Sequence, residues 1–206
     1  MQLANRSGAL NEIEYSEFVQ KVQACADALG GAPDFPDMLE VVARARELDQ
    51  LTGPLDAHLS LKLRARGAAW SVGYLAQMAA RQGFVAGALP GRLVLPADEE
   101  GAPPVLILSF DAQAALAEDP QDAPIRECAL LLDVPQTEQS RDPFPAWHAS
   151  ARKLAEDMEA DLVDEQGRPV TLHAFAAIGQ EVEELYRRLA ALDLAAGSPA
   201  ARRLFS

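Results

Sequence analysis

The sequence predicts an α+β fold in which an antiparallel sheet has helices packed on one of its faces. Residues 58–64 alternate strictly between polar and apolar side chains, which is typical of a strand with one buried face. Other segments repeat apolar residues at steps of three and four, which is typical of amphipathic helices. The 206 residues are 49% hydrophobic and 24% charged, a balance that suits one or two globular domains.

The order of these patterns gives the expected elements. Strands are expected at residues 58–64, 84–95, 104–110 and 125–134, with a small hairpin over residues 162–170. Helices are expected at residues 15–29, about 36–51, 70–83, 143–158 and 171–192, the last one capped by Thr171. Together they predict a mixed sheet-and-helix core that begins near residue 54.

The chain divides into three expected parts. Residues 1–53 form a strand–helix–helix segment, residues 54–194 form the main domain, and residues 195–206 form a flexible tail of small and polar residues. The element order of residues 1–51 recurs in residues 125–194, so that Phe18 corresponds to Trp147 and Leu29 to Met158. We interpret the N-terminal segment as a partial repeat. The alternative is that any two amphipathic helices can be aligned in this way.

Charge and cysteine content limit the function classes. The net charge of −13 makes direct binding to nucleic acid or to an anionic membrane surface unfavourable. No stretch approaches the roughly 20 apolar residues that cross a bilayer. Cys25 and Cys128 lie in apolar periodic segments, so we expect both to be reduced thiols in the core of a cytosolic protein.

No pattern in the chain is typical of catalysis or cofactor binding. His58, His148 and His173 have neither each other nor a cysteine at metal-ligand spacing. The glycine-rich phosphate-binding motifs and the G-x-S-x-G nucleophile motif are missing. We therefore predict no catalytic residues, no metal, no cofactor and no enzymatic activity.

Strand parity instead predicts an apolar surface on the sheet. If Cys128 and the alternate residues after it face the helices, Ala129 and Leu131 point away from them. The same argument turns Val105 and Ile107 outward, and Leu89 is expected to join them from the preceding strand. Apolar side chains gathered on an uncovered face indicate a binding surface. The alternative is that the N-terminal segment covers this face.

Several segments together resemble one protein family. They are the run 131–135 ending in Val-Pro, the helix through 149–158, the Asp-rich hairpin 162–168 and the helix opened by Thr171. The Gln-Gly-Phe at 82–84 is similar to the entry of that family's second strand. The chain thus resembles, over about residues 55–192, the C-terminal FtsZ-binding domain of ZipA.

The resemblance implies a split β-α-β fold, with an antiparallel sheet of about six strands and three helices on one face. It implies that the other face binds the C-terminal peptide of FtsZ, and that the full-length protein links FtsZ to the bacterial inner membrane during cell division. This part would be soluble on the cytoplasmic side, without nucleic-acid or direct membrane contact. Strand parity and the resemblance together predict eight partner-binding residues: Ser60, Lys62, Leu89, Val105, Ile107, Ser109, Ala129 and Leu131.

Two departures from the family pattern, and two other function classes, accompany this prediction. The first strand presents Ser60, Lys62 and Arg64 where the family tends to be apolar, and Asp111 stands where a large apolar residue is expected. The alternatives are a ferredoxin-like small-molecule-binding domain and a structural domain that oligomerises through the same face.

Overall fold

The computed structural model describes residues 1–99, 101–119 and 123–206, and the chain forms two compact units. Unit 1 consists of residues 1–56 and 199–206, and unit 2 of residues 57–198. Unit 2 therefore begins close to the predicted boundary at residue 54.

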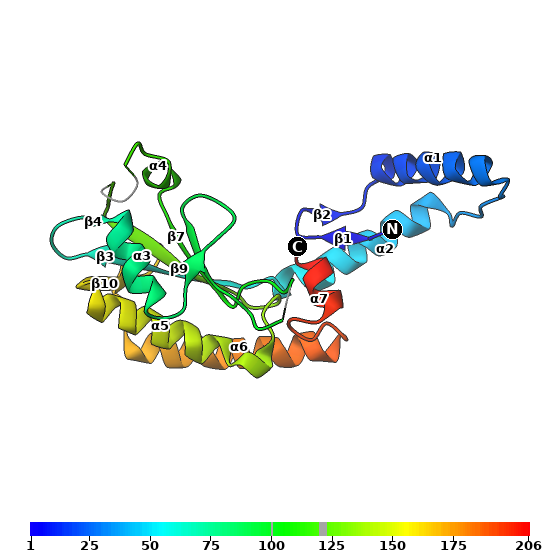
Figure 1. Cartoon of the computed structure of the whole chain (residues 1–206). Coiled ribbons are helices and arrows are strands. Elements are labelled where there is room, and N and C mark those ends of the chain that lie inside the picture. Colours follow the sequence, from blue (N-terminus) through cyan, green and yellow to red (C-terminus); the bar gives the residue numbers. More distant parts are fainter. Residues whose placement is uncertain (100, 120–122) are drawn as a thin grey trace. The chain divides into compact units, whose positions relative to one another are not determined.

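Unit 2 is built on a six-stranded antiparallel sheet with the order β10-β3-β9-β7-β6-β5 (Figure 1). The strands are β3 (His58–Ala65), β5 (Val85–Ala86), β6 (Arg92–Leu95), β7 (Leu106–Phe110), β9 (Glu127–Asp133) and β10 (Ala160–Val163). A separate two-stranded pair joins β4 (Trp70–Ser71) to β8 (Pro124–Ile125). This sheet confirms the prediction of an α+β fold with an antiparallel sheet of about six strands.

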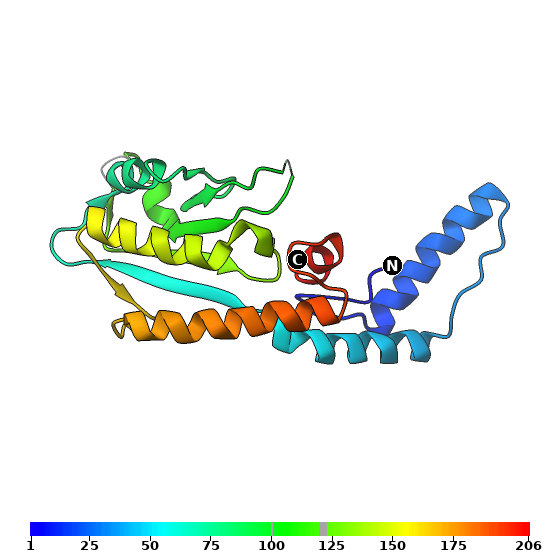
Figure 2. The ribbon, with the colours of Figure 1, turned by 90° about the horizontal axis from the view of Figure 1, so that it is seen from below.

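Three longer helices accompany the sheet. They are α3 (Val72–Ala80), α5 (Pro143–Asp157) and α6 (Leu172–Ala191), and the short α4 (Ala112–Ala115) and a 3-10 turn η2 (Gln139–Arg141) complete the unit. Helix α5 contacts β3, β9 and β10, and it also contacts both α3 and α6. Figure 2 shows α5 between these two helices. Thr171 caps α6 as predicted, because its hydroxyl accepts the backbone N–H of Ala174.

Alternating burial along the central strands creates the core. Along β9 each buried residue is followed by a half-buried one, and β7 begins with the same alternation. The inward side chains that are at most 2% exposed are Leu61, Leu63, Leu106, Leu108, Leu130 and Leu132. Each contributes roughly 1.5–3 kcal/mol by leaving water, so this leucine layer holds the helices against one face of the sheet.

Trp147 connects three elements of this core. Its side chain is 1% exposed, and its indole N–H donates a hydrogen bond of 3.0 Å to the backbone carbonyl of Leu130 on β9. Its ring also lies 5.7 Å from that of Phe175 on α6, in an edge-to-face arrangement. A buried indole needs a partner for its N–H, so this bond fixes how α5 sits on the sheet.

Unit 1 contains a small hairpin and helices. Its elements are β1 (Ala4–Asn5), β2 (Gly8–Ala9), α1 (Glu12–Leu29), α2 (Met38–Thr52), a 3-10 turn η1 (Gly53–Leu55) and α7 (Pro199–Leu204). Asn11 and Glu14 form a reciprocal capping box that begins α1. Asp37 caps α2 through its carboxylate. The helix–linker–helix order of α1 and α2 fits the predicted partial repeat, but no strand is described between them, whereas β10 separates α5 from α6.

Three sequence predictions are wrong. The tail is not flexible throughout: residues 199–204 form α7, with Ala201 and Leu204 buried, and the Gln2 side chain donates to the carbonyl of Arg203. Cys25 is exposed rather than in a core, because α1 buries only Tyr15. Residues 84–95 form two strands rather than one.

The division of residues 84–95 depends on Gly91. Its φ of +74° is a left-handed conformation that favours glycine, and an added Cβ would lie 2.6 Å from the carbonyl oxygen of Phe110. The carbonyl of Gly91 accepts the backbone N–H of Phe110 at 2.8 Å. The chain can therefore turn tightly after β5 and enter β6 beside β7.

Replacing Trp147 by phenylalanine tests the role of this side chain. Trp147→Phe leaves space and removes the donor to Leu130, so the free energy of unfolding should fall by about 2 kcal/mol. Urea unfolding followed by the fluorescence of Trp70, which also lies in unit 2, measures this. The exposed Gln77→Ala on α3 should change it by less than about 0.5 kcal/mol. Equal stabilities of the two variants would contradict the assignment.

The two cysteines should differ sharply in reactivity. Cys128 is 3% exposed, and burial together with the neighbouring Glu127 raises the pKa of its thiol to about 12, so at pH 8 it stays neutral and inaccessible. Cys25 is exposed. Ellman's reagent should label one thiol rapidly in the native protein and a second only in guanidinium. Cys25→Ser should remove the rapid reaction, and a rapid reaction that persists would contradict this placement.

Candidate peptide-binding face

The strands of unit 2 present one set of side chains on the face opposite the leucine layer, which we call the open face. It is formed by the residues that alternate with the buried ones on β3, β9, β7 and β6. Strand register arranges them into two rows across the sheet. Because neighbouring strands lie about 4.8 Å apart, side chains within one row are in contact range.

The first row, the apolar row, crosses the sheet from β3 to β5. Leu131 on β9 stands opposite Ser60 on β3 and, on its other side, opposite Ile107 on β7. Val94 on β6 stands between Ile107 and Val85 on β5. Leu131, Ile107 and Val94 are half-buried, and Val85 is 52% exposed. The row therefore offers a continuous strip of hydrocarbon to an incoming chain.

The second row, the small-residue row, lies two residues further along β3. Ala129 stands opposite Lys62, and Ser109 stands between Ala129 and Arg92. Ala129 and Ser109 have smaller side chains than Leu131 and Ile107 of the apolar row beside them. Lys62 and Arg92 stand at the two ends of the small-residue row.

Six of the eight predicted binding residues lie together in these rows: Ser60, Lys62, Ile107, Ser109, Ala129 and Leu131. Val105 precedes β7, is half-buried, and its N–H donates to the carbonyl of Leu95 at 2.9 Å. Leu89 was expected in a strand, but it lies in the loop between β5 and β6 and is 55% exposed. Its strand placement was wrong because residues 87–91 form a turn.

Sequence reasoning missed Val85, Arg92 and Val94. Their alternation was hidden by treating residues 84–95 as one strand, in which Leu93, Val94 and Leu95 have no readable parity. Gly91, next to Pro90, was the available signal, since glycine and proline mark turns. A turn placed there starts β6 at Arg92 and sets Val94 on the same face as Ile107.

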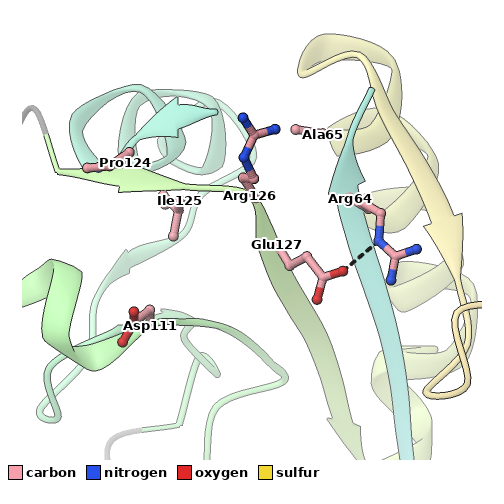
Figure 3. Close-up of a pocket in the computed structure, with 7 residues that line it drawn as sticks. All are labelled: Arg64, Ala65, Asp111, Pro124, Ile125, Arg126 and Glu127. Carbon is pink, nitrogen blue, oxygen red and sulfur yellow. Dashed lines mark hydrogen bonds and ion pairs between the residues drawn. The ribbon is translucent and has the colours of Figure 1, made fainter. Parts of the chain in front are cut away.

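A hollow of about 530 Å³ adjoins the open face where β7 ends before β3 and β9 do (Figure 3). It is lined by Arg64, Ala65, Asp111, Pro124, Ile125, Arg126 and Glu127. In Figure 3 Glu127 reaches from β9 toward Arg64 on β3, and the Arg64 Nε donates to its carboxylate at 2.5 Å. Asp111, on the other side of the hollow, caps α4 by accepting the Gln113 N–H at 2.8 Å. Arg126 donates to the carbonyl of Gly67 at 3.2 Å.

These contacts give the charged groups of the hollow structural partners. The Glu127 carboxylate is paired across two strands, and the Asp111 carboxylate satisfies a helix N-terminus. Asp111 therefore departs from the family pattern for a local reason, since it begins α4. Both carboxylates therefore have structural roles, and neither is positioned as a general acid or base.

The described histidines lie in separate places. His58 lies at one end of the open face, where its Nε2 is 3.2 Å from the Asp133 carboxylate. His148 on α5 stacks on Phe175 with ring centroids 4.1 Å apart, and burial, followed by the nearby Arg152, lowers its pKa. Its Nε2 is buried without a hydrogen-bond partner among the described residues.

Fold and surface together define a class of protein. A sheet covered by helices on one face and carrying apolar side chains on the other is typical of a module that binds another polypeptide. None of the helices described here is long and apolar enough to cross a bilayer.

Comparison with known families shows a likeness within that class. Residues 110–181 match the family described as ZipA, C-terminal FtsZ-binding domain. The match runs from the last residue of β7 through β9, α5 and β10 into α6, about a third of the 206-residue chain. Over these residues unit 2 is similar to that family, which is described as an FtsZ-binding domain. No curated protein sequence matches the chain.

Proposed function

We propose that this chain is a protein-binding module of the bacterial division machinery, and that its open face binds the C-terminal peptide of FtsZ. The observation that carries the proposal is the apolar row, centred on Leu131 and Ile107. Strands β9 and β10 of the same sheet lie within residues 110–181, which match the FtsZ-binding family. A cofactor has no part in this activity, because binding at equilibrium is the whole mechanism.

The chemistry of binding follows from the rows. Apolar side chains of the peptide would cover the exposed parts of Leu131, Ile107 and Val94, at roughly 25 cal/mol per Å² of apolar area removed from water. The open face needs little ordering on binding, because β9 and β7 are fixed by their ladder of hydrogen bonds. A few apolar anchors on such a surface give micromolar affinity.

The cellular role extends this binding. In the full-length protein the module would hold FtsZ at the cytoplasmic face of the inner membrane, where the septum forms. The open face is also suited to a second copy of the chain, since the same apolar row could pair with itself. That structural role predicts a dimer and no peptide binding.

A titration with the FtsZ C-terminal peptide tests the proposal. A fluorescein-labelled peptide should bind the intact chain with a micromolar Kd, measured by anisotropy. Leu131→Asp places a charge in the middle of the apolar row and should raise Kd at least about 30-fold, which corresponds to about 2 kcal/mol. The half-exposed position lets the new carboxylate reach water, so the fold should persist.

Ala149→Asp is the matched control, because Ala149 is exposed on α5. It should leave Kd unchanged. Light scattering on the same samples separates peptide binding from self-association. If the parent chain is a dimer that does not bind the peptide, and Leu131→Asp makes it a monomer, the open face is a dimer interface. Absence of binding at high micromolar peptide would refute the FtsZ assignment.

A further inference from the structure

Two cations of the open face have no ion-pair partner within the described part of the chain. Lys62 and Arg92, at the ends of the small-residue row, make no ion pair with any residue that the structure describes. The chain as a whole is acidic, with 31 acidic and 18 basic residues and a net charge of −13.

The carboxylates of the same strands are arranged differently. Glu127 is paired with Arg64, Asp161 with Arg66, and Asp133 with His58. Among the described residues, each of these three carboxylates therefore lies beside a basic side chain, and Lys62 and Arg92 share none of them.

Register gives these cations a defined spacing. Three strand-to-strand steps separate Lys62 from Arg92, so their backbones lie about 14 Å apart. The apolar row runs beside them, two residues away along the strands, at about 7 Å. A bound peptide can therefore contact the apolar row and reach both cations.

We propose that the open face selects an acidic apolar peptide, whose carboxylates pair with Lys62 and Arg92 while its apolar side chains cover Leu131 and Ile107. This inference rests on the proposed function and specifies the chemistry of its partner. Lys62 is half-buried, so a peptide without an anion would cover an ammonium group and leave it unpaired. An acidic peptide supplies that anion, so acidic peptides are favoured over neutral and basic ones.

Neutralising the two cations tests the proposal. With the FtsZ C-terminal peptide at 50 mM NaCl, Lys62→Gln and Arg92→Gln should each weaken binding by about 2–5-fold, and the double variant by about 10-fold. The loss should fall mainly on the association rate in stopped-flow measurements. At 500 mM NaCl the double variant should differ from the parent by less than about 2-fold, because salt screens exposed charges.

A double-mutant cycle locates the partner charges. A peptide whose Asp and Glu are replaced by Asn and Gln should bind the parent chain about 10-fold more weakly than the original peptide does. The double variant should bind the two peptides equally well, because the partner charges have already been removed. Arg188→Gln on α6 is the matched control, since Arg188 is another exposed cation without an ion pair among the described residues. It should change neither affinity nor salt dependence.

The outcomes separate this inference from the function beneath it. If Leu131→Asp abolishes binding while the double variant binds like the parent, the face binds FtsZ but not through its cations, and the inference is wrong. If the FtsZ peptide does not bind at all, peptides selected from a random phage library decide. Enrichment of Asp and Glu beside apolar residues supports the inference, and its absence overturns it. If the parent chain binds vesicles that contain 30% phosphatidylglycerol and the double variant loses that binding, the two cations bind lipid and the inference is overturned.

Discussion

Strand β9 is the constraint on which the rest of unit 2 depends. It pairs with β3 on one side and β7 on the other, so its alternation sets the facing of both neighbours. Cys128, Leu130 and Leu132 point into the core, and this leaves Ala129 and Leu131 on the open face. The indole of Trp147 then bonds to the backbone of Leu130, which connects the helical layer to the same strand. The two faces of this seven-residue strand therefore contribute to the core and to the proposed binding surface, respectively.

The sequence predicts most of this arrangement because periodicity is a local property. Strict alternation in residues 58–64 identified β3, and parity placed Leu131 and Ile107 on the outward face. The prediction for residues 84–95 failed because a continuous apolar run does not indicate which residues face the core. The turn at Gly91 divides the run and sets the facing of β6. Lys62 and Ser109 entered the predicted site through the resemblance, whereas Arg92 was missed together with its strand.

Unit 1 shows where periodicity is insufficient. The stripe from Tyr15 to Leu29 has helical spacing, and α1 does form, but only Tyr15 is buried and Leu29 is 86% exposed. Spacing predicts which residues share a face, while burial depends on whether another element packs there. The C-terminal residues illustrate the converse. Small and polar residues after 195 look unstructured, yet Leu204 and Phe205 are buried within unit 1, a nonlocal contact that no short window of sequence contains.

Gly91 has a consequence for how this surface can evolve. A side chain there would press on the carbonyl of Phe110 and would also strain a left-handed backbone. Relief requires β6 to shift away from β7, and Val94 and Arg92 would move with it. A glycine at position 91 is therefore needed to hold Val94 and Arg92, two residues of the proposed binding surface, in place. Under the proposed function, selection for partner recognition would act on this turn as well as on the surface, and loss of glycine at 91 in a descendant would indicate a changed specificity.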